Sequence, residues 1–399
     1  MVQMKNYFLK PGLISGGFFP LFFFSILFFS FIFNDMQASR QMFVLNADRT
    51  TVHYLIIGFG IYLFLYCILN IKKCRFLPKT VIFLFLLAVW IFISDQINNI
   101  QFSSVLVRES MSFLWIFVYL FFYIYGNTYA NKKVYLNLFV WSMFFSYSGG
   151  LLYYSYSIFS SYGRYQVINI IYNIIALLPW IYLLIQKKWY KWLNVAIILL
   201  TFVSLKRGAI IAVIALIFVQ LAYNNSHLLK KMITSLLVFI LLVTAFNIVN
   251  SYSSGFLEAR FQGDNFSSGS GRTSQYEIAI NDIAKRDFFT LTVGKGGNYS
   301  NGLIGRSIHN EWLEMLSSYG LVGAVLYLFL FANLLMIKDH CSNGLKIPII
   351  QMMVLCFFLT MLGSMYFAYI SIQIFAFFGL LSSKMFTEVK GNENSDSHF

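Results

Sequence analysis

Residues 232–249 read Met-Ile-Thr-Ser-Leu-Leu-Val-Phe-Ile-Leu-Leu-Val-Thr-Ala-Phe-Asn-Ile-Val, an apolar run without a charged residue. A helix of this length can cross the hydrocarbon core of a bilayer. The same pattern recurs along the chain in twelve spans, at 17–33, 52–69, 81–94, 111–126, 134–158, 167–185, 192–205, 208–223, 232–249, 319–337, 347–366 and 368–386. The sequence therefore predicts an all-α, polytopic integral membrane protein with twelve transmembrane helices, unless the tight pair 192–223 forms one kinked span.

The composition excludes a water-soluble domain. Of the 399 residues 59% are hydrophobic and 11% charged, and the mean hydropathy is +0.70. Apolar runs of such length cannot all be buried in one soluble core. Only 5 residues are proline, which permits long uninterrupted helices.

The net charge of +14 is a topology signal and does not indicate a nucleic-acid partner. With a cytoplasmic N-terminus, 17 of the 29 basic residues fall on the inner side. The short outer loops hold 6, and the long polar segment 250–317 holds the other 6. This asymmetry follows the positive-inside rule. We expect a multi-pass protein of the cytoplasmic (inner) membrane, with both termini cytoplasmic and the polar segment outside.

The polar segment also holds 7 of the 15 acidic residues, so we expect the chemistry there. The predicted organisation is membrane spans one to nine in 1–249, a large extracytoplasmic (periplasmic) loop with short amphipathic helices and the active site in 250–318, spans ten to twelve in 319–386, and a disordered cytoplasmic tail in 387–399. The loop has no cysteine, no His-Glu-x-x-His and no Asp-x-Asp pair. We therefore expect no metal site and no cofactor.

Arg272 is the first candidate site residue. Ser274 to Glu277 fits a capping box, and apolar residues follow at helical spacing, which predicts an amphipathic helix over 275–285 lying on the membrane domain. The stripe consists of Tyr276, Ala279, Ile280, Ile283 and Ala284. Arg272 would precede the helix N-terminus, where a cation is favourable if it shares an anion with the free N–H groups. Alternatively, it is a solvated residue paired with Asp264 or Glu277.

His309 is the second candidate. Ser307 or Asn310 can cap a second short helix, which Gly320 ends before the tenth span. Its apolar stripe is Trp312, Met315, Leu316 and Tyr319. An imidazole with an ordinary pKa of about 6.5 suits a general base. A lone histidine is also common as a hydrogen-bonded surface residue.

The turn Lys206-Arg207-Gly208 is the third candidate. The segments on either side are too short for full spans, so Arg207 should lie below the outer surface, where a charge indicates function. The alternative is a snorkelling pair that anchors a hairpin. Gly294-Lys295-Gly296-Gly297 lacks the nucleotide-loop pattern and is expected to be a flexible link between the two loop helices.

Three segments together resemble the O-antigen polymerase and O-antigen ligase family of bacterial envelope glycosyltransferases. Ser204-Leu205-Lys206-Arg207-Gly208-Ala209 is similar to the family's Ser/Thr-x-x-Arg-small stretch. Gly271-Arg272-x3-Tyr276, with Gly294-Lys295-Gly296, is similar to the start of its large outer loop. His309-Asn310-Glu311-Trp312-Leu313, followed by Gly320-Leu321-Val322-Gly323, resembles the loop's end and is the most specific of the three.

The resemblance implies a metal-independent membrane glycosyltransferase that uses an undecaprenyl-pyrophosphate-linked oligosaccharide at the outer face of the membrane. Its catalytic residues would be His309, Arg272 and Arg207. The residues that would bind the pyrophosphate or glycan are Arg207, Arg272, Lys206, Arg306, Asn310 and Glu311. Expected partners are the lipid-linked donor, membrane lipid, and chain-length regulator and flippase proteins. Nucleic acid is not expected.

Three functions compete. The first choice is a polymerase that joins repeat units of O-antigen or capsular polysaccharide. A ligase would pass the finished glycan to a lipid A-core acceptor in lipopolysaccharide biosynthesis with the same residues. A multi-helix transporter is disfavoured, because transporters usually carry ionisable residues at mid-membrane and repeated halves, whereas here the spans are nearly free of charge.

Overall fold

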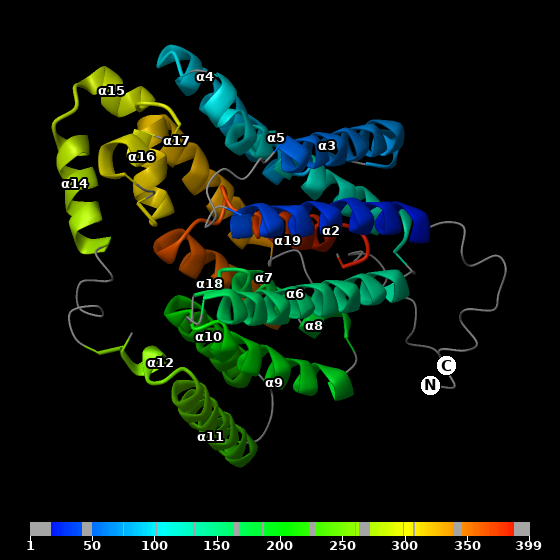
Figure 1. The fold of residues 1–399 in the computed structure, drawn as a ribbon. Coiled ribbons are helices and arrows are strands. Elements are labelled where there is room, and N and C mark those ends of the chain that lie inside the picture. The colour runs from blue at the N-terminus through cyan, green and yellow to red at the C-terminus, as the bar shows by residue number, and fades with distance from the viewer. Residues whose placement is uncertain are drawn as a thin grey trace, which may run out of the picture.

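The computed structural model describes residues 17–386, apart from the positions given at the end of this paragraph. Within the described residues the secondary structure is helical, and no strand occurs. Figure 1 shows the helices packed into one bundle, with the polar segment to one side. The positions left out are 42–49, 75, 101, 131–132, 163–166, 186, 224–227, 260, 263–271, 298, 306–307 and 338–344.

Each predicted apolar span overlaps one helix or two. The long and medium helices are α2 (Phe18–Gln41), α3 (Thr50–Asn70), α4 (Lys79–Ile97), α5 (Phe102–Thr128), α6 (Lys133–Tyr162), α9 (Lys187–Val203), α10 (Arg207–Tyr223), α11 (Leu228–Tyr252), α17 (Glu311–Met336), α18 (Lys346–Leu362) and α19 (Ser371–Leu381). Among the described residues, four helices are long and apolar enough to cross a membrane, and seven apolar helices are shorter. The all-α, multi-pass class is confirmed, whereas the number of crossings stays a prediction.

The predicted span 167–185 differs from the structure, in which it is divided into α7 (Ile171–Ile175) and α8 (Leu177–Leu184). The pair 192–223 forms two helices, α9 and α10, as counted from the sequence, and not one kinked helix. The two helices pack side by side as a hairpin, since Asn194 in the middle of α9 donates to Gln220 near the end of α10 at 3.0 Å. Both legs have 17 residues. Such a helix is about 26 Å long, shorter than the hydrocarbon core of about 30 Å.

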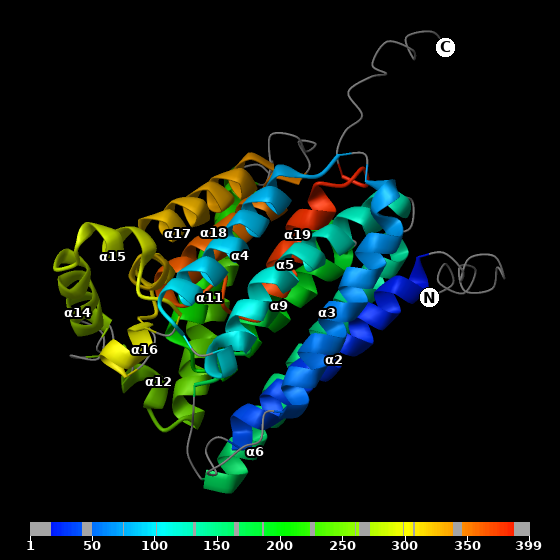
Figure 2. The same ribbon diagram turned by 90° about the horizontal axis from the view of Figure 1, so that it is seen from above.

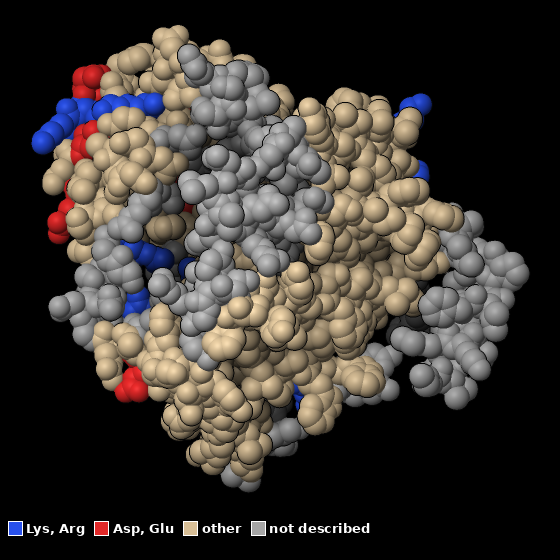
Figure 3. Space-filling model, viewed as in Figure 1, with Lys and Arg blue, Asp and Glu red and all other residues tan. Residues whose placement is uncertain are grey.

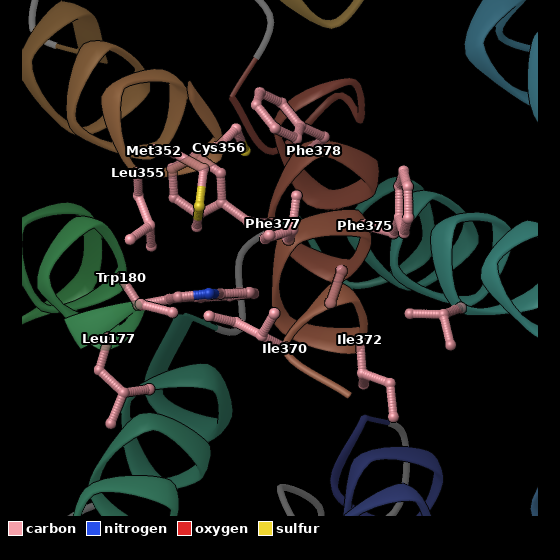
Figure 4. Close-up of a cluster of buried hydrophobic side chains, with 14 of the residues drawn as sticks. Leu177, Trp180, Met352, Leu355, Cys356, Ile370, Ile372, Phe375, Phe377 and Phe378 are labelled. Atoms are coloured by element: carbon pink, nitrogen blue, oxygen red, sulfur yellow. The ribbon is translucent and has the colours of Figure 1, made fainter. Parts of the chain in front are cut away.

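The core is built around α5 and α19, which cross closely. A Cβ on Gly379 would lie 2.3 Å from the carbonyl oxygen of Tyr119, so only glycine allows this approach of the two backbones. Aromatic side chains fill the remaining space. Trp180 of α8 packs edge-on against Phe377 of α19, with ring centroids 5.4 Å apart, and Figure 4 shows both within the buried cluster between α8, α18 and α19. Ring pairs of this kind stabilise a core beyond their buried area.

The boundary between the last two predicted spans is wrong. The sequence places a continuous helix to residue 366, but α18 ends at Leu362 and α19 begins at Ser371. The turn between them is held by the carboxylate of Glu311, which accepts hydrogen bonds from the backbone N–H groups of Met365 and Tyr366 at 2.9 and 2.6 Å. These N–H groups therefore cannot continue the helix. The carboxylate of Glu311, which is distant in the sequence, therefore determines where α18 ends.

Contacts between residues far apart in the sequence join several loops at the ends of the bundle. At one end, Lys384 N–H donates to Asn127 at 2.9 Å, and the Lys133 ammonium lies 4.7 Å from the ring centre of Phe386. At the other end, Asp95 accepts a hydrogen bond of 2.6 Å from Gly297 N–H in the polar segment. Figure 2 shows the short helices of this segment gathered beyond the ends of α4 and α17. Which end faces the cytoplasm stays a prediction.

Candidate active site

The polar segment contains four short helices in its described part. They are α12 (Phe256–Ala259), α14 (Arg272–Ala284), α15 (Phe288–Val293) and α16 (Tyr299–Ile304). A helix is present where the sequence predicts one, but the predicted apolar stripe is only partly confirmed, because Ala279 is buried whereas Ile280 and Ala284 are exposed. Helix α14 also begins earlier than predicted, at Arg272. Ser274 therefore lies inside the first turn, and the predicted capping box is wrong. Arg272 is the first residue of α14 and does not precede it.

Arg272 and Arg207 approach each other from distant segments. Partial burial lowers the pKa of Arg207, which precedes the apolar segment of α10, and the positive charge of Arg272 lowers that pKa further. Both guanidinium groups are partly buried. Within the described residues, Arg272 makes no salt bridge to Glu277, which is exposed, and Asp264 lies outside the described residues. Two like charges at close range are unfavourable on their own and become favourable when an anion lies between them.

Lys206 and the ring of Tyr172 lie next to the two arginines; Arg207, Arg272 and Lys206 together are called the cation cluster. The Lys206 ammonium lies 5.9 Å from the centre of the Tyr172 ring, at the start of α7, and Arg272 also interacts electrostatically with Tyr172. The turn that carries Lys206 is fixed by Ser204, whose carbonyl accepts from Ile168 N–H at 3.0 Å. It also contains Leu205 at φ 55°, an unusual conformation for a branched residue. The turn between α9 and α10 therefore has a specific conformation that is held by a hydrogen bond to a distant segment.

The backbone at His309 is contacted by Tyr276 of α14. Tyr276, four residues after Arg272, donates its hydroxyl toward the His309 carbonyl at 3.5 Å and toward the Met361 carbonyl at 3.5 Å. Residues four apart lie on the same side of a helix, so the side of α14 that carries Arg272 also faces the His309 turn. His309 is exposed and has a φ of 56°, in the left-handed region. Backbone strain of this kind concentrates at functional sites.

The short helix after His309 forms as predicted. Asn310 is its N-cap and accepts a hydrogen bond of 3.1 Å from Leu313 N–H. Met315 and Tyr319 of the predicted stripe are completely buried. Gly320, at φ 67° and ψ −167°, breaks α17 into this helix and the apolar span that follows. The sequence signals for start and stop are both confirmed.

Glu311 has a different environment from the one expected of a substrate-binding residue. Its side chain is completely buried, and its two oxygens accept from Tyr327, Ser364, Met365, Tyr366 and Phe367. A carboxylate surrounded by this many protein donors has little capacity left for a ligand. Through these hydrogen bonds Glu311 joins the start of α17 to the turn between α18 and α19. Arg306, also assigned to substrate, lies outside the described residues.

The segment Gly294 to Gly297 is not a flexible link, contrary to the prediction. Gly296 N–H donates to the Ser318 carbonyl at 2.7 Å, and Gly297 N–H donates to Asp95 at 2.6 Å. A Cβ on Gly294, at φ 84°, would lie 2.3 Å from the Ser318 carbonyl oxygen. The segment docks there because Gly320 interrupts the helix and frees the carbonyls of the preceding turn. Sequence spacing alone cannot reveal that long-range pairing.

A charged network joins α14 to this docked segment. Asp282 accepts from Arg286 at 2.6 Å, from Lys295 at 3.3 Å and from the Tyr299 hydroxyl at 2.9 Å. Burial alone would raise the pKa of Asp282, but the hydrogen bonds from Arg286, Tyr299 and Lys295 outweigh it and lower that pKa. The hydrogen bond to Tyr299, followed by that to Asp282, raises the pKa of Lys295. Only the spacing of Asp282 and Arg286, four residues apart on a helix, could have suggested part of this network.

Arg286 extends the network to α17, the helix that follows His309. Its guanidinium is almost fully buried and donates to the Ser317 carbonyl at 2.8 Å, at the C-terminal end of the helix before Gly320. A cation there is favoured by the helix dipole. The network therefore connects α14, which begins at Arg272, to the helix that follows His309.

The surface is hollowed where these elements meet. Figure 3 shows Lys and Arg side chains at the floor of a hollow between α14 and the ends of α10 and α18. Within the described residues, no group of three or more His, Cys, Asp or Glu side chains could hold a metal ion. The arrangement offers several cations and a histidine around a partly enclosed surface, which suits a substrate with clustered negative charge.

The fold and this site define a multi-pass membrane protein with a cationic site in a large polar loop. The family model for O-antigen ligase matches residues 192–328. The matched region contains all three motif segments, and the chain therefore carries an O-antigen ligase family domain, as the motifs indicated. None of the curated proteins compared with the chain matches it.

Proposed function

We propose that this protein polymerises lipid-linked oligosaccharide repeat units, of O-antigen or capsular polysaccharide, at the outer face of the cytoplasmic membrane. The observation that carries this proposal is the approach of Arg207 and Arg272, with Lys206 beside them, at a hollow bordered by the His309 turn. A pyrophosphate-linked glycan presents two phosphates next to a reactive anomeric carbon, and its chemistry fits this charge distribution.

In the proposed reaction an acceptor sugar hydroxyl attacks the anomeric carbon of the donor. The new C–O bond forms as the bond between the anomeric carbon and the pyrophosphate oxygen breaks, and its electron pair leaves with undecaprenyl pyrophosphate. Arg207 and Arg272 would stabilise this leaving group with planar, bidentate donors, and Lys206 would add a point charge.

His309 would accept the hydroxyl proton. A neutral imidazole is available near neutral pH, and general-base assistance typically contributes 10²–10⁴-fold, an order-of-magnitude range. Tyr276 contacts the His309 carbonyl and would position this turn relative to Arg272. We assign Asn310 to the cap that begins the next helix and Glu311 to the frame behind it. Arg306 is retained as a proposed substrate ligand.

A polymerisation assay tests this function directly. Purified protein in vesicles of phosphatidylethanolamine and phosphatidylglycerol receives undecaprenyl-pyrophosphate-linked repeat units without a nucleotide sugar or an added metal ion. We expect lipid-linked products of increasing length and release of undecaprenyl pyrophosphate in equal number to the bonds formed. Release without chain growth would indicate hydrolysis and contradict the proposal.

A ligase is the second candidate, because the family model does not distinguish it from a polymerase. It would use the same residues but transfer the glycan to a lipid A-core acceptor. Deletion of the gene separates the two functions. For a polymerase, the gel ladder of envelope glycolipid should collapse to a single band with one repeat unit. For a ligase, that band should also disappear while long chains accumulate on the lipid carrier. An unchanged ladder would contradict both functions and favour a transporter.

A further inference from the structure

Helix α15 presents two adjacent aromatic side chains on the outside of the molecule. Phe288 is 82% exposed and Phe289 62% exposed. Exposing two neighbouring phenyl rings to water is unfavourable, and a contiguous exposed apolar surface usually marks a contact with a partner or a membrane. We propose that α15 is an interfacial anchor whose Phe288 and Phe289 lie in the lipid surface of the outer leaflet.

The depth of α15 is fixed by hydrogen bonds to a membrane span. The hydroxyl of Ser94 in α4 donates to the Val293 carbonyl at the end of α15, at 2.9 Å. Trp90 in α4 donates to the Tyr319 carbonyl, next to the docked end of α15, at 2.8 Å. Helix α4 is long and apolar enough to cross a membrane and ends at Ile97. Trp90 therefore lies about 10 Å from the end of that helix, and the C-terminal end of α15 reaches the depth of the last two turns of α4.

The neighbours of α15 carry apolar side chains on their outer surface. On α4, Phe92 is 43% exposed and Ile97 44% exposed. On α17, beyond the kink at Gly320, Leu321 is 42% exposed. In Figure 1 and Figure 2, α15 lies beside the end of α4 at the edge of the molecule, whereas α14 and α16 lie farther along the bundle axis in Figure 2. Exposed apolar side chains thus occur on α15 and on the two helices to which its docked end is hydrogen-bonded, as expected where these helices face lipid.

The aromatic residues are held outward by a rigid frame. Asp287 caps α15 by accepting hydrogen bonds of 2.8 Å from both the N–H and the hydroxyl of Thr290. At the other end, Gly294 is in close contact with the backbone at Ser318. The cap stabilises the helical conformation at the first end, and the contact at Gly294 holds the second end against the rest of the molecule. A short helix with an apolar outer edge at interface depth matches the physical requirements of a membrane-surface anchor.

Nitroxide accessibility in vesicles tests the proposal. The four native cysteines are replaced, single cysteines are introduced as Phe288→Cys, Phe289→Cys, Phe92→Cys and Asn301→Cys, and the labelled proteins are reconstituted in phosphatidylethanolamine and phosphatidylglycerol. We expect the ratio of oxygen to nickel-complex accessibility to exceed one at 288, 289 and the lipid reference 92. The ratio should fall below one at 301, an exposed position on α16. A water-like ratio at both phenylalanine positions would overturn the proposal. So would protection from both reagents, because it indicates a covering protein or a second copy.

Unsubstituted protein gives an independent measurement, which is needed because a nitroxide is itself apolar. A diazirine carried on a lipid acyl chain is photoactivated in the same vesicles, and the modified peptides are mapped by mass spectrometry. Carbene insertion should occur at 288–289 as well as at 92–97, and 299–304 should be spared. Labelling of 92–97 with no labelling of 288–289 would show that α15 stays out of the lipid.

Discussion

Arg207 and Arg272 are the residues on which the proposed chemistry depends most. Each is partly buried, and the two guanidinium groups interact electrostatically although they come from the α9–α10 turn and from α14. Two like charges that interact in this way repel each other. An anion bound by both arginines would offset that repulsion, which is why the proposed chemistry is tested first at these two positions.

Replacement of either arginine by lysine should remove most activity. A lysine keeps the charge but cannot grip two phosphate oxygens in one plane. For Arg207→Lys and Arg272→Lys we expect a loss of about 10²-fold in turnover, comparable with removal of one preorganised donor. The measurement is polymer formation from lipid-linked repeat units. Lys285→Ala, an exposed lysine at the end of α14, is the matched control and should be unaffected. Activity at the normal level in both arginine variants would rule out the pyrophosphate clamp.

His309→Ala should abolish chain growth while leaving the amount of folded protein unchanged. The side chain is exposed, so its removal leaves no cavity. We expect a loss of about 10²–10⁴-fold, the usual contribution of a general base. Donor binding, measured with the lipid pyrophosphate alone, should persist because the arginines remain. If His309→Ala binds no lipid pyrophosphate, the histidine has another role.

At the scale of elements, the helix break at Gly320 organises the polar segment. It exposes the Ser317 and Ser318 carbonyls, which receive Arg286 and Gly296. A Cβ on Gly320 would lie 2.3 Å from the Thr292 carbonyl oxygen, and the residue has a φ of 67°. Neither the backbone conformation nor the space permits a side chain.

Gly320→Ala should therefore destabilise the loop and reduce activity. A strained non-glycine conformation costs about 1–3 kcal/mol, and the displaced backbone adds to this cost. Gly302→Ala on α16 is the control, because a Cβ there meets nothing within 4 Å. Limited proteolysis of the loop in vesicles should show faster cleavage in Gly320→Ala and no change in Gly302→Ala. Equal cleavage of the two variants would mean that the break does not hold the loop.

The network around Asp282 should make the attachment of α14 sensitive to acid. Its hydrogen bonds lower the folded-state pKa of Asp282 below the ordinary value of 3.8. The carboxylate therefore stabilises the loop above its unfolded pKa, and this contribution is lost as the pH falls through the folded pKa. We expect amide exchange in α14 to rise below about pH 4 relative to the surrounding trend. In Asp282→Asn, the amides of α14 should exchange faster at neutral pH, and their exchange should show no additional rise below about pH 4. An identical rise in both proteins would contradict this account.

At the scale of the whole molecule, the predicted topology places successive loops at opposite ends of the bundle. Contacts such as Asn127 with Lys384 and Asp95 with Gly297 show which loops share an end. The distribution of basic residues then predicts which end is cytoplasmic.

Thiol labelling in whole cells tests that orientation. In a background without native cysteines, Asn301→Cys should react with a membrane-impermeant reagent, and Lys72→Cys should be protected until the cells are permeabilised. Residue 301 lies on α16 in the polar segment, and residue 72 lies at the opposite end in the short helix Ile71–Lys73. The reverse pattern would place the polar segment in the cytoplasm and remove the argument for an outer-face reaction.

The sequence by itself determined the helical segments, the hydrophobic spans and the start and end of the helix from Asn310 to Gly320. These features depend on local composition, on the length of an apolar run and on capping residues, all of which act between near neighbours in the chain. The motif residues Arg207, Arg272 and His309 could also be chosen from the sequence, since charged and titratable residues are rare in such a chain.

Only the tertiary structure decided the use of several other residues. Glu311, expected to bind substrate, is buried and joins three helices. The Gly294–Gly297 segment, expected to be a flexible link, is docked, and α18 ends at Leu362. Each outcome depends on hydrogen bonds between segments far apart in the chain. Such bonds form only after the helices pack, and they override local preference because a buried backbone or charged group left without a partner costs more free energy than a broken helix.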